Sequence, residues 1–480
     1  MSSPNGTLGA MIWKLIERGG SQAVSLVVQI ILARLLSPND FGLLAVIIVF
    51  VNVGNVLVQS GLNMALVQAD TVEEGDYSGV FFTSLSISIF LYLLLFLSAP
   101  QIEAFYNLSG MALYLRVLGL MLVINSFSCV QIAYLTRNMY FSDLCRFTLL
   151  ASVLSGAIGI LIAFAGGGLW SLIVQQISNQ LIFSISLRMI VPWKPRFDFE
   201  VLRIKKLFSF GWKVCVSNCV NVLYQNAYDL VIGKMFSASV LGYFSQGRKY
   251  PNALGTVFDE AIQAVMLPTL ARKQNDRAAL KESLRKSLSV ELCFIAPLML
   301  FVAMYAEEIV RVLLTDKWLP SVPFIRVFCI GYIFAPLSSN NLQALYALGR
   351  SDIVLKLEFV KKTIGLVLLA VTAVGLHDVF AVACGAVVYN MIVVVVNSFP
   401  NARLLNYGAL SQIKDYGIPL AASFGSCAAS LFLSFLFGPG VHRVIIKGVT
   451  FICFYIALIA FLKPLGWKYA MDKISDFRSR

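Results

Sequence analysis

Long apolar runs, separated by short polar turns, constrain this chain more than any other feature of its sequence. A helix needs about 20 apolar residues to cross the hydrocarbon core of a membrane, and we predict about fourteen such spans. Hydrophobic residues make up 58% of the chain and charged residues only 13%, too few to coat soluble domains of this length. The pattern predicts an all-α polytopic membrane protein, and it excludes a soluble enzyme and a transmembrane β-barrel. The predicted spans cover residues 10–35, 41–67, 78–99, 112–136, 144–166, 169–191, 207–236, 239–267, 287–305, 322–348, 353–375, 379–399, 413–437 and 443–463.

The basic residues predict how the chain is oriented in the membrane. The formal net charge is +13, and Lys and Arg gather in alternate connections between the spans and in the C-terminal tail. Because such connections stay on the cytoplasmic side, we expect both termini in the cytoplasm and an even number of spans. This charge needs no nucleic-acid partner to explain it.

Two segments of the sequence resemble each other and predict an internal repeat. Residues 31–45 read ILARLLSPNDFGLLA and residues 231–245 read VIGKMFSASVLGYFS, which aligns Ser37 with Ser237 and Gly42 with Gly242. Since six spans separate the two segments, the halves would have the same orientation, as in parallel transporter repeats. We predict two six-helix lobes, residues 1–200 and 201–405, and a final helix pair with its tail, residues 406–480.

Polar residues recur at helical spacing within four of the predicted spans. Intramembrane polar side chains face a partner or a water-filled cavity, and steps of three and four place each set on one helix face. The repeat relates spans 10–35 and 41–67 to spans 207–236 and 239–267, so we expect one hydrated cavity; interhelical hydrogen bonding is the alternative. The expected cavity-lining residues are Gln22, Gln29, Asn52, Asn55, Gln59, Asn63, Asn218, Asn221, Gln225 and Asn252.

Charged residues inside these spans indicate the ligand and a route for coupling. Adjacent cations suit an anion such as a phosphate group, so we expect Arg248 and Lys249, together with Arg18 and Lys14, to bind one; snorkelling to the surface is the alternative for Lys14. A carboxylate that changes its protonation could couple transport to H⁺ or Na⁺. The candidates for this role are Glu260, Asp229 and Glu17, with structural hydrogen bonding or ion pairing as the alternative.

The sequence lacks the motifs of an enzyme. It contains two histidines, no P-loop pattern, no GxSxG or HExxH motif, and no connection long enough for a catalytic domain. Cys215 and Cys219 share a helix face, but small packing residues explain them better than metal ligands do. We expect a transporter without a metal or cofactor, driven by an ion gradient, the membrane potential or substrate flux.

Several segments resemble a known family over essentially the whole chain. They are residues 31–45, SGLNMALVQ at 60–68, GYFSQGRKYPNAL at 242–254, VMLPTLARKQND at 265–276, and W-x-x-x-E-R at Trp13, Glu17 and Arg18. These segments resemble the polysaccharide-transport (Wzx-type) flippases of the multidrug/oligosaccharidyl-lipid/polysaccharide exporter superfamily, in particular the colanic-acid-exporter-like branch.

The resemblance implies a function and a cellular location. It implies that an undecaprenyl-diphosphate-linked oligosaccharide moves from the cytoplasmic to the periplasmic leaflet of the bacterial inner membrane by alternating access. It also implies that the family's Gly-Tyr-Phe-Ser motif falls on residues 242–245, with its following cation at Arg248. We expect a monomer whose partners are the lipid-linked substrate, membrane lipid and the polysaccharide polymerase machinery. A drug/cation antiporter of the same superfamily and a membrane glycan polymerase or ligase are the alternatives.

Overall fold

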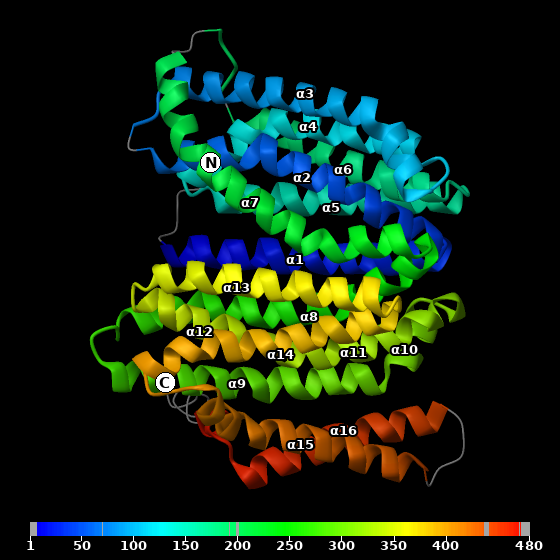
Figure 1. Cartoon of the computed structure of the whole chain (residues 1–480), viewed down its shortest axis with the longest axis vertical. Helices are drawn as coiled ribbons and strands as arrows, with labels where there is room; N and C mark the ends of the chain where they lie inside the picture. Colours follow the sequence, from blue (N-terminus) through cyan, green and yellow to red (C-terminus); the bar gives the residue numbers. More distant parts are fainter. Residues whose placement is uncertain are drawn as a thin grey trace. The chain divides into compact units, whose positions relative to one another are not determined.

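The computed structural model describes residues 7–69, 71–191, 193–197, 201–435, 441–469 and 471. The described chain is helical, without a strand, so the predicted all-α fold is confirmed (Figure 1). Its first eight helices are α1 (Thr7–Leu35), α2 (Pro38–Gln68), α3 (Glu74–Tyr106), α4 (Met111–Arg137), α5 (Phe141–Phe164), α6 (Leu169–Ile190), α7 (Val201–Met235) and α8 (Ala238–Ala271). The later elements are α9 (Arg277–Met304), α10 (Ala306–Leu313), η1 (Asp316–Ser321), α11 (Val322–Ile333), α12 (Ala335–Ala347), α13 (Ser351–Ala370), η2 (Val371–Gly375), α14 (Val379–Leu404), α15 (Ala409–Phe435) and α16 (Val441–Leu462).

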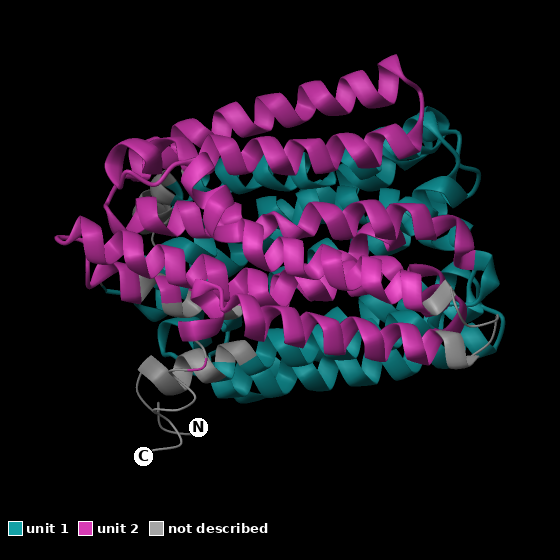
Figure 2. Ribbon diagram, turned by 90° about the horizontal axis from the view of Figure 1, so that it is seen from below, with its two compact units in different colours: residues 1–245, 313–317 teal, residues 246–312, 318–480 magenta. Residues whose placement is uncertain are grey.

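The chain forms two compact units (Figure 2). The first contains residues 1–245 with 313–317, and the second contains residues 246–312 with 318–480. The boundary between these units falls within α8, after Ser245. The division into lobes at residues 1–200 and 201–405 with a final pair at 406–480 remains a prediction.

In the first unit, α2 and α4 are central helices, each packed against several others. Helix α2 packs along α7, α4 and α3, while α5 packs against α1 and α6. A buried apolar cluster joins α2, α3 and α4 through side chains that include Leu66, Phe81 and Val130. This packing fixes one face of α2 and leaves its polar face toward α7.

The repeated segments of the sequence have matching roles in the first unit. Ser37 caps α2: its hydroxyl accepts a hydrogen bond from the Asp40 amide, and the Asp40 carboxylate accepts one from the Ser37 amide at 3.0 Å. Ser237 accepts from the Val240 amide at 3.3 Å in the same way before α8. These contacts explain why both segments have serine at this place.

Two glycines let α2 and the start of α8 cross with their backbones in contact. A Cβ atom on Gly42 would lie 1.7 Å from the Ala238 carbonyl oxygen, and one on Gly242 would lie 2.0 Å from the Pro38 carbonyl oxygen. Only glycine fits this distance at either place. The aligned glycines of the repeat thus meet each other in the fold.

In the second unit, α9 contacts α11, α12 and α15, and α14 packs on α11, α12 and α13. Figure 1 shows α15 and α16 side by side. An ion pair fixes α15 to α9, since the guanidinium of Arg285 donates to both oxygens of Asp415 at 2.8 and 2.7 Å. Tyr407, in the turn before α15, donates to Asp415 at 2.9 Å; burial raises the pKa of this phenol, and the hydrogen bond to Asp415 raises it further.

The predicted spans agree with the observed helices in order, with two differences. Residues 322–348 were expected to form one helix, but the structure breaks it into α11 and α12 next to Pro336, because proline cannot donate the backbone hydrogen bond that would continue the helix. The span expected at 287–305 begins earlier, at Arg277, where Asp276 caps the helix by accepting from the Ala279 amide at 2.9 Å. Its first turns are charged, so hydropathy alone misses them.

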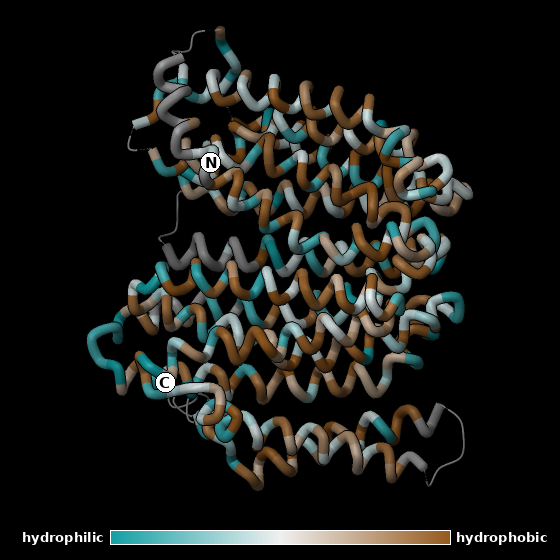
Figure 3. The backbone as a smooth tube through the Cα atoms, in the orientation of Figure 1, coloured by the Kyte–Doolittle hydropathy of each residue, from teal (hydrophilic) through white to brown (hydrophobic). Residues whose placement is uncertain are grey.

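The described helices expose many large apolar side chains, as expected of a surface in contact with lipid. On α3, large side chains including Phe90 and Leu97 lie exposed, while Ser84 and Ser88 are buried. Figure 3 shows hydrophilic residues gathered in turns such as the connection between α8 and α9. By length and composition, nine helical segments in the described part of the chain qualify to cross a membrane, one of which is Asp316–Ala347, the run of η1, α11 and α12. The protein is therefore a multi-pass membrane protein, and the count of fourteen spans remains a prediction.

Candidate functional site

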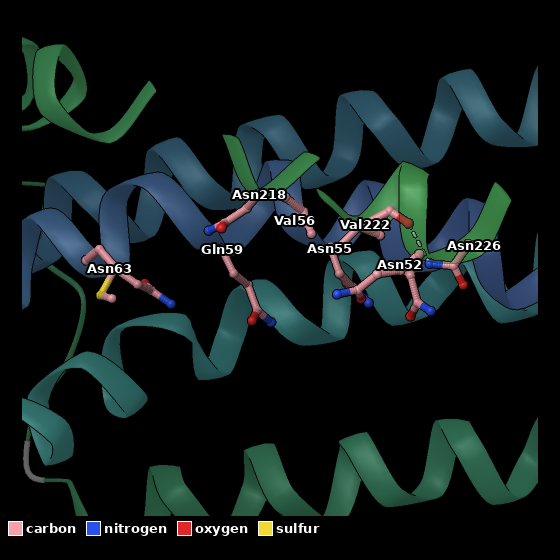
Figure 4. A pocket seen from close by; sticks show the side chains of 10 residues that line it. Asn52, Asn55, Val56, Gln59, Asn63, Asn218, Val222 and Asn226 are labelled. Atoms are coloured by element: carbon pink, nitrogen blue, oxygen red, sulfur yellow. Dashed lines mark hydrogen bonds between the residues drawn. The ribbon is translucent and has the colours of Figure 1, made fainter. Parts of the chain in front are cut away.

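A polar cleft of about 420 Å³ lies between α2 and α7 in the first unit. Figure 4 shows its labelled asparagine and glutamine side chains, which come from these two helices. The lining residues are Asn52, Asn55, Val56, Gln59, Asn63, Met64, Asn218, Val222, Gln225 and Asn226.

Side chains of α4 donate hydrogen bonds to two of these amide groups. The side-chain oxygen of Asn55 accepts a hydrogen bond from the Asn125 amide, and the side-chain oxygen of Asn63 accepts one from the Cys129 thiol. Both asparagines are half-buried and line the cleft. Because their oxygens are engaged by α4, their NH₂ groups remain as the donors available to a ligand. The cleft therefore suits a ligand that is rich in oxygen acceptors, such as a sugar or a phosphate.

The structure brings together most of the residues predicted to line a cavity. Asn52, Asn55, Gln59, Asn63, Asn218 and Gln225 all line this cleft. The other four predicted residues are outside its lining: Gln22 and Gln29 on α1, Asn221 on α7 and Asn252 on α8. Interhelical hydrogen bonding was the alternative to a hydrated cavity for these polar residues. It also occurs, because the side chains of Asn55 and Asn63 accept hydrogen bonds from α4.

The predicted cations belong to both units. Arg18 is exposed on α1 in the first unit, and the side chain of Lys14 lies outside the described residues. Arg248 and Lys249 are half-buried on α8 in the second unit. Their role in binding an anion remains a prediction.

The three acidic candidates for ion coupling have different surroundings. Glu17 and Asp229 are buried in the first unit, with 9% and 7% of their surface exposed. Glu260 is exposed on α8. Its neighbour Asp259 instead accepts hydrogen bonds from Gln263 and from Ser339 on α12.

The sequence analysis did not predict three residues that lie at the cleft or beside the acidic candidates. Asn226 lines the cleft beside the predicted Gln225, and its NH₂ group donates to the Val222 carbonyl at 2.7 Å (Figure 4). Asn125 of α4 is followed by Ser126, Ser128 and Gln131, a polar group that the sequence analysis did not include among the cavity candidates. Asp259 adjoins the predicted Glu260, and the helical spacing from Asp259 to Gln263 is a signal that could have found it.

A profile described as "Polysaccharide biosynthesis protein" matches residues 31–323. The chain belongs to this family. The family predicted from the sequence motifs is thereby confirmed.

Several named proteins are similar to this chain at low sequence identity. The succinoglycan biosynthesis transport protein ExoT of Rhizobium meliloti (strain 1021) is 26% identical over 66% of this chain and 65% of its own length. The teichuronic acid biosynthesis protein TuaB of Bacillus subtilis (strain 168) is 23% identical over 62% of both chains. The lipopolysaccharide biosynthesis protein WzxC of Escherichia coli (strain K12) is 21% identical over 93% of this chain and 90% of its own. The chain thus spans less than two thirds of ExoT and TuaB and most of WzxC.

Solved structures share the fold of this family member. The lipid II flippase MurJ, in an inward closed conformation, matches with a TM-score of 0.76 at 13% identity, over 94% of this chain and 99% of that one. An inward-facing multidrug resistance MATE family transporter of the MOP superfamily matches with a TM-score of 0.61 at 14% identity, over 82% and 95% of the two chains. The helical fold is therefore that of MOP superfamily transporters.

Proposed function

We propose that this protein is a flippase that carries a lipid-linked oligosaccharide from the cytoplasmic to the periplasmic leaflet of the bacterial inner membrane by alternating access, for the export of a surface polysaccharide. The observation that carries the proposal is the cleft between α2 and α7, which is lined by Asn55 and Asn63 while α4 occupies their side-chain oxygens. Their NH₂ groups are donors that fit the hydroxyl and phosphate oxygens of a glycolipid head group. Membership of a polysaccharide biosynthesis family and a flippase-like fold support it.

The proposal assigns the diphosphate of the lipid to Arg248 and Lys249, with Arg18 and Lys14 as further cations. A guanidinium fork binds phosphate oxygens in pairs, and an ammonium group adds a point charge. The substrate and the membrane lipid are the partners, and polysaccharide polymerase machinery would receive the product. The protein works as a monomer, and both of its termini lie in the cytoplasm. Its cycle is coupled to H⁺ or Na⁺ through a buried carboxylate.

The experiment uses proteoliposomes that contain a fluorescent undecaprenyl-diphosphate oligosaccharide. A membrane-impermeant reductant destroys the fluorophore in the outer leaflet, so flipping is seen as additional loss of signal. We expect the wild type to flip the lipid, Arg248→Ala to abolish flipping and Arg248→Lys to retain part of it. Arg146→Ala is the matched control, because Arg146 is an exposed arginine of α5.

Two results would contradict the proposal. Wild-type protein that moves the lipid no faster than empty liposomes would remove the flippase function, and counter-transport of a small organic cation instead would favour the antiporter alternative. Normal flipping by Arg248→Ala at normal abundance would remove only the assignment of the diphosphate to Arg248.

A further inference from the structure

Two acidic side chains meet inside the second unit, in a cluster of polar groups contributed by α8, α9 and α12. Asp259 of α8 and Glu291 of α9 accept hydrogen bonds from two consecutive residues of α12, Ser339 and Asn340. Glu291 has no exposed surface. Asp259 is half-buried. Two neighbouring carboxyl groups, one of them fully buried, are costly when both are ionised, so their protonation state needs an explanation.

The hydrogen bonds to the pair leave one oxygen atom without a donor. Asp259 accepts from the Ser339 hydroxyl and from the Gln263 amide, one on each oxygen. Glu291 accepts from the Asn340 amide on Oε2. Its other oxygen, Oε1, has no hydrogen-bond donor among the described residues. One donor is therefore missing from an otherwise occupied cluster.

A proton supplies that missing donor. Two carboxylates in contact repel each other, whereas a carboxylic acid donates its O–H to the neighbouring carboxylate. Glu260 beside Asp259 adds a further negative charge. A metal ion fits this place less well, because it needs several free oxygen ligands and three of the four carboxyl oxygens already accept hydrogen bonds.

We propose that Asp259 and Glu291 bind one proton between them, carried on Glu291 Oε1, and that this pair is a proton-binding site of the second unit. Loss of the proton would place two negative charges side by side against α12, whose Ser339 and Asn340 would have to rearrange. Protonation is thereby linked to the packing of α8, α9 and α12. Its part in transport rests on the proposed flippase function, but the bound proton does not.

Infrared spectroscopy of the purified protein tests the site without any substrate. The C=O stretch of a protonated carboxyl group is separate from that of a carboxylate. Near pH 7 we expect this band in the wild type and in Glu74→Gln, a matched control at an exposed glutamate of α3. We expect its loss in Glu291→Gln, where the amide replaces the O–H donor to Asp259, and in Asp259→Asn, where Asn can donate to an ionised Glu291.

The possible results distinguish failure of the proton site from failure of the flippase function. A wild type without the band, or a band that persists in both Glu291→Gln and Asp259→Asn, would overturn the proton site. The two variants keep the size of the side chains, and their elution as single folded species is checked first. In proteoliposomes, Glu291→Gln should lose the acceleration of lipid flipping by a pH gradient. A present infrared band with no flipping by the wild type would leave the proton site standing and reject the flippase function.

Discussion

The amide groups of Asn55 and Asn63 combine two roles that usually belong to different residues. Each one bonds to α4 with its oxygen and lines the cleft with the rest of its side chain. The hydrogen bond fixes the rotamer, so the NH₂ group keeps its direction when no ligand is bound. Such fixed donors bind a ligand at a lower entropic cost than mobile ones.

Replacing Asn55 with leucine should affect both roles. Asn55→Leu removes the acceptor for Asn125 and puts an apolar group in the cleft, so we expect flipping to fall at least tenfold and stability to fall by about 0.6 kcal/mol, a typical value for one interhelical hydrogen bond in a membrane. Thermal unfolding in detergent and the liposome assay measure the two effects. Asn221→Leu, on an exposed part of α7 outside the cleft, is the control and should retain flipping. Equal flipping by the two variants would reject the cleft as the substrate site.

For single residues, the sequence predicts which polar side chains share a helix face better than it predicts where that face points. The steps of three and four on α2 group Asn52, Asn55, Gln59 and Asn63, and all four lie along one cleft. Successive residues on a helix point about 100° apart, however, and nothing local says which of two neighbours faces inward. For the same reason Asp259 enters a polar cluster while Glu260 is exposed.

At the scale of elements, the helix caps at Ser37 and Ser237 predict two losses of stability of different size. Ser37→Ala should lower stability by about 1 kcal/mol, because it removes a capping box in which Asp40 also bonds back to the Ser37 amide. Ser237→Ala should cost less, since valine at position 240 cannot return such a bond. Thermal unfolding of the two variants measures the order, and a larger loss in Ser237→Ala would contradict this reading of the caps.

The glycine contact between α2 and α8 gives a sharper prediction. Gly42→Ala and Gly242→Ala should each prevent the first unit from packing, because the added Cβ atom would overlap a backbone carbonyl oxygen. We expect little folded protein in the membrane, measured as the monodisperse fraction after extraction. Gly19→Ala on α1 has no atom within 4 Å of the new Cβ and should be neutral or slightly stabilising. Normal yields of Gly42→Ala would show that the helices can move apart without penalty.

Helix positions were predictable because turn residues mark most of their ends. The errors have local causes: an apolar window passes over the break next to Pro336, and the charged start of α9 looks like a loop to a hydropathy window. The contact between Gly42 and Gly242 was not predictable from their alignment, because similar segments of a repeat need not touch.

At the scale of the whole molecule, the distribution of Lys and Arg predicts topology. In a version without the nine native cysteines, Gln274→Cys should react with an impermeant maleimide only after the cells are opened, and Pro38→Cys should react in intact cells. The basis is the cluster of basic residues around the α8–α9 turn, which stays in the cytoplasm. The reverse pattern of labelling would invert the orientation and the direction of export.

The meeting of residues 38–42 with residues 238–242 also limits how this chain can be recombined with a relative. A hybrid joined near residue 200 would take the two sides of the contact from different parents, and it would assemble only if both parents have the same close fit there. A junction after Ser245 keeps both sides from one parent. Exchanging parts between exporters to alter which glycan is carried should therefore succeed more often with the later junction.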